Sequence, residues 1–215
     1  MQKTVPATKA TTATTQEVEI KIKTTPALLK KIEAWLKKNA TFQGEELHRE
    51  LYLDNPNATF FFTRPDGEKD ALKYLRVRWL DLQQGFKGSV CFKDWYEDEN
   101  GRTTHCDEFE TKVADPDMML ALFERLGYTH KTVTAKKRKK FRFKEYEIVV
   151  DEVQDLGTFV EIEMKKQVSD FKAALHELEM FLVKKIGITE YWIQTRGYAS
   201  SFRNPDFEFG EHRKH

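Results

Sequence analysis

Apolar and charged residues alternate along several segments of the chain, and a period of two predicts β-strands. The clearest segment, residues 17–23, reads Glu-Val-Glu-Ile-Lys-Ile-Lys. In a strand, Val18, Ile20 and Ile22 share one face and the charged residues share the other. One such strand is explained by the solvated outer face of an antiparallel sheet. The same pattern in further strands favours a second interpretation, a charged inner face.

The same periodicity predicts most of the other secondary structure. Further strands are expected at residues 47–53, 58–63, 73–82, 88–97, 103–113, 132–143, 145–151 and 158–165. Helical spacing of apolar residues predicts helices at 26–39, 115–126 and 169–186, and a short fourth helix from Thr189. Asn100-Gly101 predicts a tight hairpin turn. Clustered, hairpin-linked strands with these helices indicate an α+β fold built on a large antiparallel sheet.

Several predicted strands carry charged residues two or four positions apart on one face. These are Glu17 and Glu19 with Lys21, Arg76 with Arg78, Glu108 with Glu110, Lys136 with Arg138, Glu147 with Asp151, and Glu161 with Glu163, while Lys93 shares a face with Cys91. If the sheet closes on itself, these faces line a tunnel and the helices pack outside. Buried charges must compensate one another. The ligand that suits such a tunnel is a polyphosphate with a divalent metal, because arginine and lysine bind phosphate oxygens and carboxylates bind the metal.

Composition narrows the function classes. The 215 residues include 36 Lys+Arg and 35 Asp+Glu, and a net charge of +1 argues against a general polyanion binder but leaves room for a local basic pocket. Two cysteines, Cys91 and Cys106, indicate free thiols in a reducing cytosol. No apolar run reaches the length of a membrane span, and residues 1–15 lack a secretory signal. We therefore expect a cytoplasmic protein whose first residues are a short disordered tail rather than a transit peptide.

Two other interpretations of the basic residues are weaker. The run from Lys136 to Lys140 has the composition of a nuclear-localisation or nucleic-acid motif, but its alternation into Phe141 and Phe143 favours a strand. A non-catalytic polyphosphate or nucleic-acid module could use the same basic residues. Such a module would not need acidic residues on the same faces. The sequence has no glycine-rich phosphate loop, so phosphate contacts must come from side chains.

The order of these motifs resembles the CYTH superfamily of triphosphate tunnel enzymes, which unites class IV adenylyl cyclases and thiamine triphosphatases. Glu17-Val-Glu-Ile-Lys21 resembles the Glu-x-Glu-x-Lys motif of that family. Arg76-Val-Arg78, Phe92-Lys93 and Glu108-Phe-Glu110 resemble its next motifs, and Lys136-Lys-Arg138 and the segment from Asp151 to Glu163 look like the class IV cyclase branch. The resemblance covers about residues 16–200. It implies an eight-stranded antiparallel closed barrel or tunnel, two-metal chemistry and a triphosphate substrate. Residues 45–55 and the stretch between Arg78 and Lys93 depart from the pattern, which leaves the organic part of the substrate open.

These observations define the expected site. We expect Mg²⁺ or Mn²⁺ to be held by Glu17, Glu19, Glu108, Glu110, Asp151, Glu161 and Glu163. We expect the phosphates to be held by Lys21, Arg76, Arg78, Lys93, Lys136 and Arg138. Lys21 and Asp151 are the catalytic candidates. The general base stays open among Asp151, a hydroxide on the metal and a deprotonated Lys21.

The expected reaction is the conversion of ATP to cyclic AMP and pyrophosphate. Hydrolysis of thiamine triphosphate or inorganic triphosphate is the alternative. We expect one domain over residues 16–203, between a disordered tail at 1–15 and a flexible tail at 204–215. The expected partner is a triphosphate small molecule, with no nucleic acid and no membrane, and a homodimer is left open.

Overall fold

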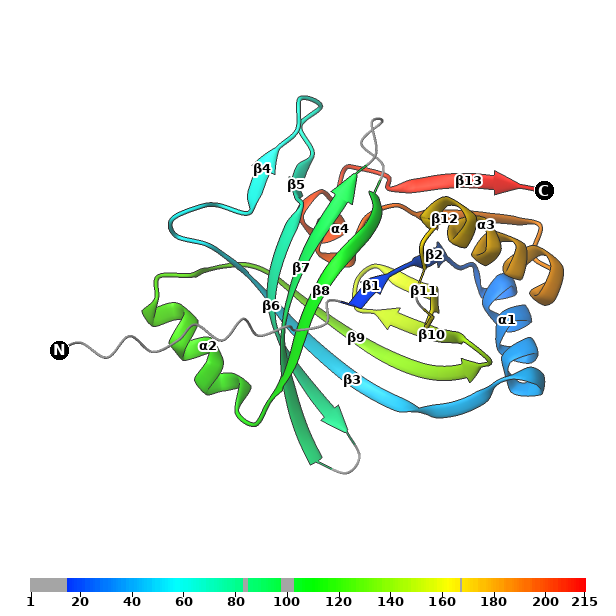
Figure 1. Ribbon diagram of the computed structural model, residues 1–215, viewed down its shortest axis with the longest axis horizontal. Helices are drawn as coiled ribbons and strands as arrows, with labels where there is room; N and C mark the ends of the chain where they lie inside the picture. The colour runs from blue at the N-terminus through cyan, green and yellow to red at the C-terminus, as the bar shows by residue number, and fades with distance from the viewer. Residues whose placement is uncertain (1–14, 83–84, 98–102, 167) are drawn as a thin grey trace.

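The computed structural model describes residues 15–82, 85–97, 103–166 and 168–215, and Figure 1 shows how its elements are arranged. The strands are β1 (Thr15–Glu17), β2 (Glu19–Lys23), β3 (Thr41–Asp54), β4 (Phe61–Thr63), β5 (Lys69–Ala71), β6 (Lys73–Leu82), β7 (Gly85–Glu97), β8 (Thr103–Val113), β9 (Thr129–Phe143), β10 (Tyr146–Val153), β11 (Gly157–Met164), β12 (Glu190–Gln194) and β13 (Gly210–Lys214). The helices are α1 (Pro26–Asn39), α2 (Pro116–Arg125), α3 (Phe171–Phe181), which continues as a π-helical turn over Leu182–Ile186, and α4 (Tyr198–Arg203). The predicted α+β class is confirmed.

The main sheet is open. Among the described residues, eleven strands pair in the order β1-β8-β7-β6-β3-β9-β10-β11-β2-β12-β13, and β4 and β5 form a separate hairpin. The predicted eight-stranded closed barrel is therefore wrong. The reason lies in β2, which pairs with β11 along one edge and, through Ile22 and Lys23, with β12 along the other. Only the three residues of β1 are left to pair with β8.

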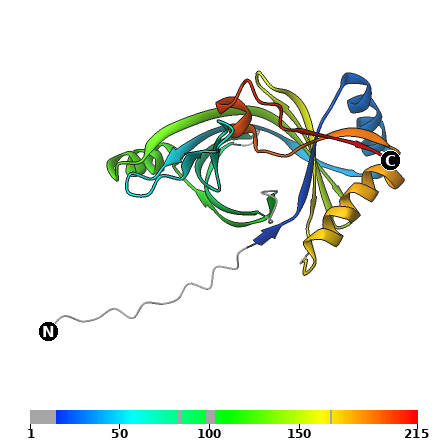
Figure 2. The same cartoon turned by 90° about the horizontal axis from the view of Figure 1, so that it is seen from above.

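The sheet is nevertheless curved around a concave side. β1 and β2 follow each other in the chain, separated by Val18, yet they pair with β8 and β11, which lie far apart in the sheet order. Residues 15–23 therefore connect the two arms of the sheet, and Figure 2 shows the curvature from above. This arrangement turns the charged strand faces toward one another.

The apolar face of β2 packs on α1 and α3, outside the concave side. Val18, Ile20 and Ile22 are buried, as the alternation predicts, in one cluster with Leu36 of α1 and Leu178 of α3. Burying these apolar side chains stabilises the fold, because it removes apolar surface from water. In Figure 1 both helices lie on the same side of the molecule, beside β10 and β11.

Helix α2 covers the other arm of the sheet. Its Phe123 packs against a second cluster that includes the fully buried Leu53 of β3 and Val77 of β6. Asp115 caps the helix, because its carboxylate accepts a hydrogen bond from the Met118 amide at 2.8 Å. The Asp-Pro start predicted from the sequence is thus the observed start.

The C-terminal part differs from what the sequence predicts. Residues 190–194 form β12 instead of a helix from Thr189, because Tyr191, Trp192 and Ile193 favour an extended strand. Gly210–Lys214 form β13 on β12, which differs from the flexible tail expected at 204–215. Residues 1–14 and the Asn100-Gly101 turn lie outside the described residues. In the described part of the chain, no helix has the length and apolar character that crossing a membrane requires.

Candidate active site

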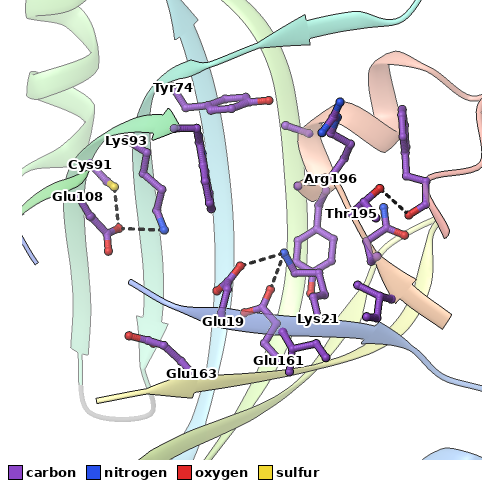
Figure 3. Close-up of a pocket in the computed structure, with 18 of the residues that line it drawn as sticks. Glu19, Lys21, Tyr74, Cys91, Lys93, Glu108, Glu161, Glu163, Thr195 and Arg196 are labelled. Atoms are coloured by element: carbon purple, nitrogen blue, oxygen red, sulfur yellow. Dashed lines mark hydrogen bonds and ion pairs between the residues drawn. The ribbon is translucent and has the colours of Figure 1, made fainter. Parts of the chain in front are cut away.

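The concave side of the sheet forms a cavity of about 800 Å³, part of which is shown in Figure 3. The predicted site residues that line it are Glu19, Lys21, Arg76, Arg78, Lys93, Glu108, Glu110, Lys136, Arg138, Glu161 and Glu163. Asp151 lies next to this lining and is fully buried. Glu17 lies in β1 opposite Cys106, but its side chain is outside the described residues. The charged faces of separate strands thus meet at one cavity.

One part of the wall is a compact cluster of acidic and basic groups on β2, β9, β10 and β11. Lys21 Nζ lies 3.0 Å from Glu161 Oε1 and 3.5 Å from Glu19 Oε1, as Figure 3 shows. Arg138 donates to both carboxylate oxygens of Asp151 and, at 2.6 Å, to Glu161. The strand register explains these contacts, since Lys21 is paired with Glu161 and Arg138 with Asp151. The cluster is therefore specified by the sheet itself.

The charge state of this cluster follows from its burial and its partners. Burial lowers the pKa of Lys21, but the carboxylates of Glu161 and Glu19 outweigh burial, and the net pKa is raised. Burial raises the pKa of Asp151, yet Lys136 and the Arg138 guanidinium hold the net pKa below its usual value. Lys136 behaves differently, because burial and then Arg138 lower its pKa. Lys21 is therefore held as a cation, while Lys136 loses its proton more readily than an ordinary lysine.

Glu50 of β3 is the central acid of the other part of the wall, and the sequence analysis missed it. Its side chain is 1% exposed and accepts hydrogen bonds from Arg78 Nε at 2.8 Å, Tyr52 at 2.9 Å and Thr134 at 3.2 Å. Arg76 Nη1 lies 3.6 Å from Glu50 Oε1. Burial raises the pKa of Glu50, but the surrounding cations hold it well below the usual range. The strand period could have placed Glu50 on the cavity face, because residues 48, 50 and 52 share one face of the strand.

The acids of β8 contact cations from β6 and β7. Glu108 Oε1 lies 3.5 Å from Lys93 Nζ and accepts a hydrogen bond from Cys91 Sγ at 3.0 Å. Glu110 Oε1 lies 3.3 Å from Arg78 Nη1. The cations predicted to grip phosphate are therefore each held by a carboxylate in this structure. Their role as phosphate ligands stays a prediction.

A second pair on β3 was also missed by the sequence analysis. The ring of His48 donates from Nε2 to Glu46 at 2.8 Å, and Lys140 Nζ donates to the same carboxylate at 2.9 Å. Burial lowers the pKa of His48 to about 4, and nearby cations such as Arg78 add to the effect. His48 is thus neutral near pH 7, and Glu46 fixes its orientation.

The predicted metal ligands in the described part of the chain do not form a complete metal site by themselves. Within the described ranges, no three His, Cys, Asp or Glu side chains form a group that could hold a metal ion. Glu19 and Glu163 are paired across β2 and β11, and both line the cavity. Mg²⁺ commonly binds through one or two carboxylates and completes its coordination with water and substrate phosphates. The Glu19–Glu163 pair fits this mode of binding, in which the substrate completes the site.

Residues 15–190 match the CYTH domain. The chain belongs to the CYTH family. A candidate adenylate cyclase from Methanocaldococcus jannaschii is 27% identical over 184 residues, which is 85% of this chain and 95% of that protein. A Pyrococcus horikoshii structure superposes with a TM-score of 0.71 and 25% identity, over 88% of this chain and 99% of its own. A Hippeastrum protein, described as a candidate adenylyl cyclase with a dominant triphosphatase activity, superposes with a TM-score of 0.60 and 19% identity, over 90% and 97%.

The CYTH family is enzymatic and binds triphosphate substrates. In this CYTH chain, the cations of β2, β6, β7 and β9 surround one cavity, and the acids of β2, β3, β8, β10 and β11 hold them in place. Such a lining suits a ligand with several negative charges. It does not discriminate between reactions at different phosphorus atoms of that ligand.

Proposed function

We propose that this protein is a metal-dependent enzyme that binds ATP in the cavity and converts it to cyclic AMP and pyrophosphate. The observation that carries the proposal is the convergence of six cationic side chains on one cavity, each held by an acidic partner. They are Lys21, Arg76, Arg78, Lys93, Lys136 and Arg138. Guanidinium groups bind phosphate oxygens in a bidentate manner, and lysines contribute point charges.

A bound triphosphate would take over hydrogen bonds that the carboxylates now accept. Figure 3 shows Lys93 and Lys21 reaching toward the same space from different strands. A phosphate chain between them contacts both, which restricts the reacting phosphorus to one position and orientation. The same fixed donors would stabilise charge that develops on the phosphate oxygens in the transition state.

A divalent cation, Mg²⁺ or Mn²⁺, is proposed to be held by Glu19 and Glu163 together with the substrate phosphates. The other candidate ligands are Glu17, Glu108, Glu110, Asp151 and Glu161. A bound ion would supply positive charge that neutralises the phosphate oxygens. Replacing these carboxylates one at a time tests which of them hold the metal.

Cyclisation requires a proton acceptor. The ribose 3′-hydroxyl attacks the α-phosphorus, the bond between this phosphorus and the bridging oxygen breaks, pyrophosphate leaves, and the hydroxyl proton passes to a base. Lys21 suits this role poorly because its pKa is raised. Asp151 also suits it poorly, because Arg138 engages both of its oxygens. Neither of the two predicted catalytic residues is therefore in a state that favours accepting this proton.

Hydrolysis of a terminal phosphate is the second candidate reaction. It needs the same cationic grip, but water attacks the terminal phosphorus instead of a ribose hydroxyl. The name of the Methanocaldococcus relative favours cyclisation. The triphosphatase activity stated for the Hippeastrum protein is the reason to keep thiamine triphosphate and tripolyphosphate as alternative substrates.

Product analysis tests the proposal. The protein is incubated with Mg²⁺ or Mn²⁺ and with ATP, thiamine triphosphate or tripolyphosphate in turn. Cyclic AMP with pyrophosphate from ATP supports cyclisation, whereas orthophosphate released faster from a non-nucleotide substrate replaces it with hydrolysis. Arg78→Gln should abolish turnover. The matched control is Arg49→Gln, because Arg49 lies 5.7 Å from the Trp79 ring and does not line the cavity.

A further inference from the structure

The chain beyond residue 190 supplies part of the cavity wall, although the CYTH match ends there. Residues 193–199 all line the cavity, and Figure 3 shows Thr195 and Arg196 across the space from Lys93. Tyr198, the first residue of α4, contacts the charged cluster. Its side chain is buried, with 5% of the residue exposed. Both the ring and the hydroxyl of this buried side chain therefore lie beside charged groups.

Both ends of the Tyr198 side chain contact the predicted catalytic groups. The hydroxyl donates to Asp151 Oδ2 at 3.0 Å. Lys21 Nζ lies 4.7 Å from the centre of the ring, and Lys136 Nζ lies 5.0 Å from it. Both distances are in the range of a cation–π contact. Burial, and then Glu161 and Asp151, raise the pKa of the phenol, so the hydroxyl remains a donor.

We propose that Tyr198 is a positioning residue for the reaction of this site. Its hydroxyl fixes the carboxylate of Asp151, and its ring holds the ammonium groups of Lys21 and Lys136 at the cavity. The inference rests on the proposed function and assigns the C-terminal segment a part in it. Two lysines beside one ring repel each other, so the negative face of the ring and the acids around it keep both in place.

The segment that carries Tyr198 is fastened to the rest of the fold on the other side of the cavity. Arg196 Nε donates to Glu68 at 2.8 Å, and the hydroxyl of Ser200 lies 3.0 Å from that of Tyr74. Glu68 precedes β5, and Tyr74 belongs to β6. The Phe159 ring packs 5.0 Å from the Tyr198 ring, centre to centre. Tyr198 is therefore held from several directions, as a positioning residue must be.

Two substitutions separate the hydroxyl from the ring. Tyr198→Phe removes only the hydrogen bond to Asp151, and Tyr198→Leu also removes the cation–π surface. Tyr146→Phe is the matched control, because Tyr146 is a buried tyrosine that donates to Glu177 at 2.5 Å and does not line the cavity. Turnover is measured with Mg²⁺ on whichever triphosphate the wild type converts. Affinity for tripolyphosphate is measured by calorimetry, and folding by circular dichroism.

We expect Tyr198→Phe to lower kcat about tenfold, because a hydrogen bond to a charged group is lost, with little change in tripolyphosphate affinity. Tyr198→Leu should in addition weaken tripolyphosphate binding about fivefold, because the lysines lose their support. The control should match the wild type in both measurements. If Tyr198→Leu does not fold, Tyr198→Phe still tests the hydroxyl.

Wild-type turnover and binding in both folded variants would overturn the inference, and so would an equal loss in the Tyr146→Phe control. A wild type that neither binds tripolyphosphate nor turns over any triphosphate would overturn the proposed function and this inference together. If the wild type is active and Tyr198→Phe is equally active, only the inference about Tyr198 fails and the proposed function stands.

Discussion

Replacing Glu50 by Gln tests whether the cavity depends on internal charge compensation. Glu50 is the buried acid that accepts a hydrogen bond from Arg78 at 2.8 Å and lies 3.6 Å from Arg76 and 4.0 Å from Lys136. Glutamine keeps the shape and one acceptor oxygen but removes the charge. Three cations then lose part of their compensation in a site that water reaches poorly.

The expected cost can be bounded from this geometry. Removing one partner of a buried ion pair costs about 3–5 kcal/mol, because the other charge stays buried without a partner. Arg78 retains a hydrogen bond to the amide oxygen, so we expect the lower end, about 3 kcal/mol. Tripolyphosphate should restore the charge balance. It should therefore bind the variant more tightly than the wild type and stabilise it more, since a ligand that binds only the folded state adds to stability.

Urea unfolding, with and without tripolyphosphate, measures both effects. Glu45→Gln is the matched control on the same strand, because Glu45 pairs at 2.8 Å with Lys137, whose side chain is 43% exposed, and this pair should contribute little to stability. A Glu50→Gln protein as stable as the wild type, or one that tripolyphosphate stabilises no better, would refute the reasoning. Unchanged stability would show that water or a rearranged acid compensates the cations. Unchanged stabilisation by tripolyphosphate would show that these cations do not contact the ligand.

Three further predictions follow from the same site. Replacing Glu17 and Glu19 together by Gln should abolish metal-dependent turnover while leaving the urea midpoint nearly unchanged, and full activity of that protein would remove the metal assignment. His48 should contribute a fall in stability of about 3 kcal/mol between pH 6.5 and pH 4, because its ring binds a proton near pH 6.5 in the unfolded chain and only near pH 4 in the folded protein. His48→Gln should remove this part of the fall, and an unchanged slope in that variant would contradict the assignment. Arg76→Ala should strongly weaken tripolyphosphate binding but hardly affect adenosine binding, and calorimetry showing equal losses would argue against a phosphate role.

The local elements were predictable because their signals are local. Thr25-Pro26 and Asp115-Pro116 start helices as capping chemistry requires. The period of two placed Val18 in the core and Lys21 at the cavity without any knowledge of the partner strands. Closure of the sheet was not predictable in this way. It depends on whether β2 pairs with β8 or with β12, and β12 comes from a segment that the sequence analysis assigned to a helix.

The candidate site was predictable where charges repeat and hidden where they do not. Arg76 and Arg78 form a visible pair, and the strand period alone directs them to one face. Glu50 has His48 and Tyr52 two positions away on its face, so no carboxylate or cation stands at the spacing of two that marks the other strands. Tyr198 is a single aromatic residue beyond the alternating strands. Its contact with Asp151 spans 47 residues of sequence, and no local pattern encodes such a contact.

The carboxylates in the cavity affect how a triphosphate and a metal would bind. Without ligand, Glu161 holds Lys21 and Arg138, and Glu50 holds Arg78. A triphosphate that takes these cations leaves the carboxylates with weaker partners in a poorly hydrated site, and that loss opposes its binding. A bound divalent cation would offset this loss, because it would supply the carboxylates with a new positive charge. We therefore expect the metal and the triphosphate to bind cooperatively, each raising the affinity for the other by the same factor.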